Sequence, residues 1–156
     1  MEKIKKEKKV KSILERLAEA RQIIRDTKVE KLGNNTYSKY KYFTPEQTEQ
    51  LVSEACEQTG TIVLCNLLAD ENGYYQTLDF ISIDNPEDKL SFELRTEKGA
   101  ITATSATQQM GGTDTYSERY IKMKVFQIKD NNLDPDSQDN SKTPKKATTT
   151  DDIDLD

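Results

Sequence analysis

Residues 61–95 constrain the fold most, because in them three β-prone segments are separated by two short polar turns. The first turn contains Asn72-Gly73, a dipeptide typical of tight hairpins, and the last segment alternates apolar and polar residues as a strand with one buried face does. This pattern predicts an antiparallel β-meander, with strands over residues 61–69, 74–83 and 90–95.

Two amphipathic helices are predicted ahead of the meander. Apolar residues recur at steps of three and four over residues 10–27, which indicates a helix with one apolar face. A second helix is predicted over residues 45–59, because Thr44 and Gln47 form a capping box at its start and Gly60 provides a stop at its end. Helices combined with an antiparallel meander predict the α+β class.

Residues 36–43 are rich in aromatic and hydroxyl side chains and predict a further strand. In a strand, Lys39 and Lys41 share one face while Tyr40 and Tyr42 share the other. We expect the tyrosines to pack inward. Two cations on one strand face suit a phosphate backbone, although solvated lysines are an equally simple interpretation.

A third helix is predicted from about residue 113 to 127, after a small, hydroxylated stretch with weak preference for any regular structure. Its spacing places cations beside an aromatic stripe. Cations next to aromatic rings are the composition expected of a surface for single-stranded nucleic acid, where phosphates supply affinity and exposed bases stack. The candidate residues on this helix are Tyr116, Arg119, Tyr120, Lys122 and Lys124.

Charge is distributed unevenly along the 156 residues. Residues 1–42 carry a net charge of +7, residues 43–129 carry −7 and residues 130–156 carry −5, which sum to the overall −5. The basic N-terminal block either contacts an anionic partner or is a solvated end. Residues 130–156 are too polar to form a core and predict a disordered acidic tail after a single domain over 1–129.

Several classes of function are excluded or disfavoured by composition. The chain has no His and only two Cys, so histidine-based catalysis and the usual zinc sites are ruled out. No glycine-rich phosphate loop is present, and no apolar run is long enough to cross a membrane or to act as a signal peptide. We therefore expect a cytoplasmic protein, not an enzyme, that needs no cofactor or metal, with Cys56 and Cys65 as small core residues.

Residues 108–120 resemble the signature of the ERF (essential recombination function) family of phage single-strand annealing proteins, approximately Gln-x-x-Gly-Ser-x-x-Thr-Tyr-x-x-Arg-Tyr. A second segment, residues 40–44 followed by the capped helix and Gly60, is similar to the Tyr-x-Tyr, helix, Gly segment of that family. Gly112 departs from the usual Ser, and Glu118 replaces a residue that is often basic. The signature positions matched are Gln108, Gly111, Thr115, Tyr116, Arg119 and Tyr120.

The resemblance implies ATP-independent binding of single-stranded DNA and annealing of complementary strands in phage-type recombination. It also implies a ring-forming fold, a β-meander crossed by helices, in which copies assemble into rings or filaments. A phage exonuclease or a host single-strand binding protein are further candidate partners. On this basis, Lys39, Lys41, Arg119, Lys122 and Lys124 would contact phosphates, while Tyr116 and Tyr120 would stack on bases or pack against the sheet.

Two other functions remain open from the sequence. A passive single-stranded DNA-binding protein would protect strands without pairing them, and a protein-binding regulator would have no nucleic-acid role. The end of the tail, residues 151–156, is acidic with two apolar residues. It has three interpretations: a segment that docks on partner proteins, one that competes with DNA for a basic surface, or one that only keeps the chain soluble.

Overall fold

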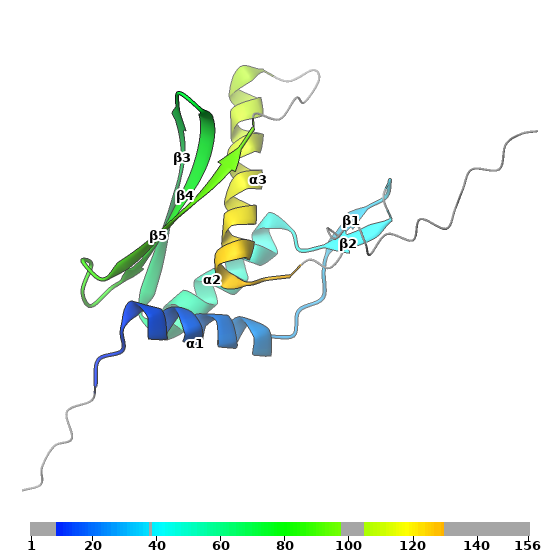
Figure 1. Ribbon diagram of the computed structural model, residues 1–156. Coiled ribbons are helices and arrows are strands. Elements are labelled where there is room, and N and C mark those ends of the chain that lie inside the picture. Colours follow the sequence, from blue (N-terminus) through cyan, green and yellow to red (C-terminus); the bar gives the residue numbers. More distant parts are fainter. Residues whose placement is uncertain (1–8, 38, 98–104, 130–156) are drawn as a thin grey trace, which may run out of the picture.

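The computed structural model describes residues 9–37, 39–97 and 105–129, and the N-terminal lysines up to Lys8 and the predicted tail lie outside these ranges. The fold is α+β, as predicted, and the described residues form three helices and two antiparallel sheets (Figure 1). None of the described helices is long and apolar enough to span a membrane. In chain order the elements are α1 (Ile13–Asp26), β1 (Gly33–Asn35), β2 (Tyr40–Tyr42), α2 (Pro45–Thr59), β3 (Thr61–Asp70), β4 (Gly73–Ser82), β5 (Lys89–Thr96) and α3 (Ala106–Phe126).

Each helix begins at a capping box, in which a hydroxyl accepts a backbone N–H three residues on and a Glu or Gln reaches back. The helix α2 has the predicted bounds and ends at Gly60, whose φ of 65° is left-handed. The helix α3 begins at Ala106, earlier than predicted. Ser105 and Gln108 form its capping box, a local signal that outweighs the weak helix preference of the residues that follow.

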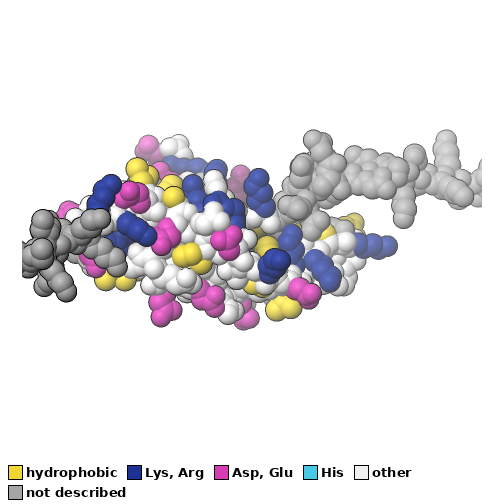
Figure 2. Space-filling view, turned by 90° about the horizontal axis from the view of Figure 1, so that it is seen from below, with side chains coloured by type: hydrophobic (Ala, Val, Ile, Leu, Met, Phe, Trp, Pro, Cys, Tyr) yellow, Lys and Arg dark blue, Asp and Glu magenta, His cyan; other side chains and the backbone are white. Residues whose placement is uncertain are grey.

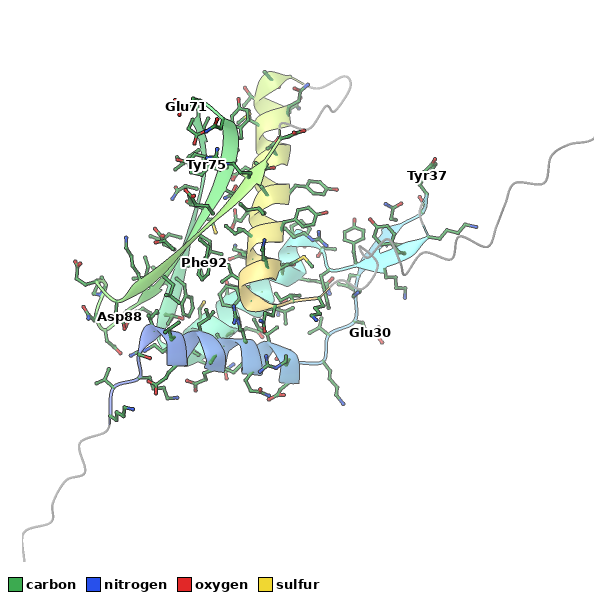
Figure 3. The ribbon with its side chains drawn as sticks, viewed as in Figure 1. Glu30, Tyr37, Glu71, Tyr75, Asp88 and Phe92 are labelled. Atoms are coloured by element: carbon green, nitrogen blue, oxygen red, sulfur yellow. The ribbon has the colours of Figure 1, made fainter. Side chains whose placement is uncertain are left out.

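The three-stranded sheet has the order β3-β4-β5 and confirms the predicted meander. Along each strand, side chains point alternately to the sheet face that packs against the helices and to the face turned away from them. On the packed face, Leu78 and Phe80 of β4 are fully buried, and the rings of Phe80 and Phe126 meet edge to face at 5.7 Å. Phe92 of β5 lies between the sheet and α3 (Figure 3).

Buried polar contacts fix how the layers sit on one another. The hydroxyl of Ser117 in α3 donates to the side-chain oxygen of Gln76 in β4 over 2.8 Å, and both residues are buried. Arg16 of α1 is 6% exposed and donates to the carbonyls of Thr59 (3.1 Å) and Gly60 (2.9 Å). Its guanidinium also pairs with Asp84 at 2.6 Å. Arg16 therefore joins α1, the end of α2 and the turn after β4.

The hairpin β1–β2 forms a separate two-stranded sheet of three residue pairs, on the side of α3 opposite the larger sheet (Figure 1). Its strands are shorter than the predicted strand over residues 36–43, because the chain turns between Asn35 and Tyr40. The side chain of Gln47 ties the approach to this hairpin onto α2. It donates to the Glu30 carbonyl over 2.7 Å and accepts from the Leu32 amide over 3.0 Å.

Candidate nucleic-acid interface

A polar, aromatic pocket of about 270 Å³ lies where the hairpin faces α3. Hairpin residues 34–36 form part of its wall, and the rest comes from four tyrosines and one arginine. These five residues, which we call the tyrosine cluster, come from segments more than 70 residues apart in the sequence. They are Tyr40, Tyr42, Tyr116, Arg119 and Tyr120.

Arg119 lies at the centre of the tyrosine cluster and is 6% exposed. Its Nε donates to the Phe43 carbonyl over 2.7 Å, which links α3 to the chain just after β2. The guanidinium carbon lies 5.3 Å from the ring centre of Tyr42 and 5.2 Å from that of Tyr120, within the range of cation–π attraction. The structure therefore places Arg119 beneath the tyrosine rings, where it positions them, and the predicted contact between Arg119 and a phosphate stays a prediction.

The tyrosines of the cluster present ring faces and edges to the pocket. Tyr116 is 61% exposed and stacks against Tyr120, which is 36% exposed, with ring centres 6.3 Å apart. Tyr40 and Tyr42 meet edge to face at 6.1 Å and are half-buried, so they line the pocket while packing against the protein. Exposed aromatic rings held in fixed orientations are suited to stacking on unpaired bases.

Gly33 is required beneath this cluster because the ring of Tyr42 lies directly on it. A Cβ atom at position 33 would meet three ring atoms of Tyr42 at 2.6 to 2.7 Å, closer than such contacts occur in proteins. Any larger residue would push the ring aside. This contact could not be predicted from the sequence, because Gly33 and Tyr42 come together only through the register of the hairpin.

Lys39 and Lys41, the predicted cations of the hairpin, are both exposed, but one lies in the turn and the other in a strand. Lys39 lies in the turn with a φ of 53°, so it does not share a strand face with Lys41 as predicted. Lys41 lies on β2. Figure 2 shows several Lys and Arg side chains at the end of the molecule where Figure 1 places the hairpin, and others over the middle and the opposite end. Tyr37, which we had not selected, is 95% exposed at the tip of this hairpin (Figure 3).

Lys122 is buried, and its ammonium contacts the carboxylates of Glu49 in α2 and Glu118 in α3. Burial opposes the charged form, but hydrogen bonds to Glu118 and Glu49 outweigh it, so the pKa of Lys122 is raised. This arrangement joins α2 to α3 and engages with carboxylates the ammonium that we had predicted to contact phosphate. Glu118, the departure from the family signature, is therefore a partner of Lys122. Lys124 is exposed and lies on the far side of Tyr120 from the hairpin, in a second pocket.

Both cysteines lie where the sequence predicted, in the apolar interior. Cys56 belongs to the core and Cys65 packs against it, and both thiols are free. Burial raises the pKa of both thiols, that of Cys65 to about 12. Within residues 9–37, 39–97 and 105–129, no group of three or more His, Cys, Asp or Glu residues is placed to hold a metal ion.

We expect the folded protein to lose stability as the pH rises above about 9, the ordinary pKa of a thiol. The unfolded chain then releases the Cys65 proton while the folded chain, with its pKa of about 12, retains it, so the contribution is complete below pH 9 and is lost between pH 9 and 12. Urea denaturation at pH 7, 9 and 10 measures this loss. Cys65→Ala should show a smaller loss than the parent; equal losses would contradict the assignment.

Comparison with known proteins gives one significant match. No curated protein and no solved structure matches the chain significantly. The model of one family, described as the ERF superfamily, matches residues 13–153, which include every residue of the tyrosine cluster. Because this match covers most of the 156 residues, the chain belongs to the ERF superfamily.

Proposed function

We propose that this protein binds single-stranded DNA and anneals complementary strands without ATP, as part of phage-type recombination. Membership of the ERF superfamily supports a role in recombination and strand annealing. The observation that carries the proposal is the tyrosine cluster, in which partly exposed rings surround a buried guanidinium beside the exposed Lys39 and Lys41. Rings of this kind stack on bases of any sequence, and lysines hold phosphates.

Annealing requires attachment that leaves the pairing edges of the bases free. Phosphate contacts fix a strand without reading its sequence, and stacking uses the faces of the bases rather than their Watson–Crick edges. The hairpin supplies both kinds of contact, with Tyr40 and Tyr42 at the pocket and Lys41 on the opposite face of the same strand. A strand held in this way stays available to a complementary strand.

The test is an annealing assay with complementary oligonucleotides that carry a fluorophore and a quencher, without ATP. The protein should accelerate pairing above the spontaneous rate, and Tyr116→Ala should reduce this acceleration. Leu14→Ala is the control, because Leu14 is an exposed apolar residue of α1 and belongs neither to the tyrosine cluster nor to the outward face of the three-stranded sheet. Slower pairing would indicate a passive binding protein, and no oligonucleotide binding at low salt would indicate a regulator without a nucleic-acid role.

The contribution of the hairpin lysines is measured by the salt dependence of binding. Each phosphate contact to a single strand contributes about 0.7 to the slope of log K against log salt concentration. The double variant Lys39→Asn, Lys41→Gln should therefore lower the slope by about 1.4. Asn is chosen at position 39 because it tolerates the left-handed backbone there.

Lys89→Gln serves as the control for this titration, because Lys89 is exposed at the start of β5, away from the hairpin (Figure 1). Its slope should equal that of the parent protein. If the control and the double variant give the same slope, the hairpin does not contact phosphates.

We further propose that copies of the chain assemble, in rings or filaments. The face of β3 turned away from the helices exposes Ile62, Leu64 and Leu68 at 39 to 49%, and within the described ranges β3 and β5 are both edge strands. Exposed apolar side chains next to an open edge support contact between copies. Electron microscopy with and without an oligonucleotide tests this: closed rings or filaments support it, and monomers in both samples would refute it.

A further inference from the structure

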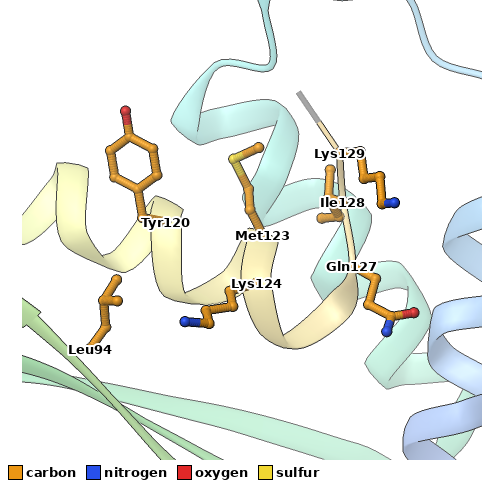
Figure 4. A pocket seen from close by; sticks show the side chains of 7 residues that line it. All are labelled: Leu94, Tyr120, Met123, Lys124, Gln127, Ile128 and Lys129. Atoms are coloured by element: carbon orange, nitrogen blue, oxygen red, sulfur yellow. The ribbon is translucent and has the colours of Figure 1, made fainter. Parts of the chain in front are cut away.

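A second pocket, of about 580 Å³, lies between β5 and the end of α3 and is not used by the function proposed above (Figure 4). Leu94, Met123 and Ile128 give it apolar walls, and Lys124 and Lys129 supply two exposed cations. None of the residues that line it is acidic. Its chemistry therefore favours an occupant that combines apolar side chains with negative charge.

The end of α3 is built so that the chain turns back along this pocket. Gln127 has a left-handed backbone with a φ of 57°, and the Ile128 amide donates to the Met123 carbonyl over 2.9 Å. This geometry ends the helix and places Ile128 and Lys129 beside the last turn. Lys129, the last residue that the structure describes, consequently lies at the pocket itself.

The stretch after Lys129 contains one segment with the matching chemistry. Residues 151–156 read Asp-Asp-Ile-Asp-Leu-Asp, so two apolar side chains alternate with carboxylates. In an extended conformation Ile153 and Leu155 lie on one face, and Asp152, Asp154 and Asp156 lie on the other. Elsewhere between residues 130 and 156, the only apolar residues are Leu133 and Ala147.

We propose that residues 151–156 of this chain dock in the pocket, with Ile153 and Leu155 against its apolar walls and the carboxylates near Lys124 and Lys129. The chain is long enough for this: a polar chain of the 23 residues from 130 to 152 spans about 25 Å on average, and it is joined to Lys129, which lines the pocket. Tethering also raises the effective concentration of the segment to about the millimolar range, so a weak contact suffices.

Docking at this position bears on DNA binding because Tyr120 lines both pockets. A segment seated against Tyr120 restricts access to one ring of the tyrosine cluster and brings carboxylates close to it. The docked segment therefore competes with a DNA strand for this end of α3. This consequence rests on the proposed function, whereas docking itself does not.

Methyl NMR of the full chain tests the docking without DNA. The chain has three methionines, and Met123 lines the pocket. The double variant Ile153→Ser, Leu155→Ser should shift the Met123 methyl resonance, while Leu133→Ser, a matched apolar replacement outside the segment, should leave it in place. If both variants give the parent spectrum, the segment does not occupy the pocket. If only an added oligonucleotide moves the resonance, the pocket takes a DNA strand instead, and the proposal is overturned.

Oligonucleotide affinity at low salt then tests the competition. The Ile153→Ser, Leu155→Ser variant should bind several-fold more tightly than the parent, and the Leu133→Ser variant should bind as the parent does. A third variant replaces the four Asp residues of the segment with Asn. If this variant binds more tightly while Ile153→Ser, Leu155→Ser binds as the parent does, the tail acts only through its overall negative charge, and competition through this pocket is overturned. Failure of every variant to bind DNA would instead count against the proposed function and leave the NMR result standing.

Discussion

Arg119→Ala is expected to weaken binding of a single-stranded oligonucleotide by about 1 to 3 kcal/mol, roughly five- to 150-fold in Kd. The guanidinium is 6% exposed, donates to the Phe43 carbonyl and lies against Tyr42 and Tyr120. Its removal releases both rings and the end of β2, so the binding surface must be ordered again each time a strand binds. Fluorescence anisotropy at a fixed salt concentration measures the loss.

The salt dependence separates positioning from direct phosphate contact at Arg119. If the guanidinium only positions the tyrosines, Arg119→Ala lowers affinity without changing the salt slope, and Arg119→Lys, which lacks the planar fork, restores little. A slope that falls by about 0.7 and recovers in Arg119→Lys would show that it holds a phosphate, as first predicted. Gly33→Ala is an independent check: it displaces the Tyr42 ring, keeps every charge, and should also weaken binding.

Arg16→Ala is expected to lower the free energy of unfolding by about 3 kcal/mol. The side chain is buried and makes charge-assisted hydrogen bonds to the carbonyls of Thr59 and Gly60 and to Asp84. Alanine leaves the end of α2 without these donors and creates a cavity between α1 and the turn after β4. A loss of this size is a large part of the stability of a single domain.

Urea denaturation at pH 7 measures this effect as a shift in midpoint without a change in slope. Arg25→Ala is the matched control, because Arg25 belongs to the same helix but is exposed and bonds only locally, to Gln22. The control should change stability by less than about 0.5 kcal/mol. Equal losses of stability at both positions would show that the buried contacts of Arg16 add nothing to the free energy of unfolding.

Much of the fold could be predicted because its signals are local. The capping box of Thr44 and Gln47 and the stop at Gly60 give the bounds of α2, and the meander follows from alternation and turn residues. The start of α3 carries the same kind of local signal, the capping box of Ser105 and Gln108, but the weak helix preference of the residues after it led to a predicted start that is too late. The buried contact between Ser117 of α3 and Gln76, 41 positions apart, has no such local signal.

In the candidate site, too, contacts between sequence neighbours could be predicted and contacts between distant segments could not. The sequence predicted Tyr116, Arg119 and Tyr120 as neighbours, since they lie within one helical segment. It could not predict that Arg119 reaches Phe43, 76 positions away, or that Lys122 meets Glu49, 73 positions away. Whether a cation is exposed or buried against a distant carboxylate depends on packing between elements, and this packing cannot be predicted from the residue type alone.

The hairpin β1–β2 has one more consequence. It pairs with no other strand in the described part of the chain, and three residue pairs are too few to be stable alone, so it depends on anchors such as Gln47 and Arg119. Its amides should therefore exchange with solvent much faster than those of β4. Under the proposed function, a hairpin that opens and closes would let a strand enter from the side, with no need for a free end to thread through.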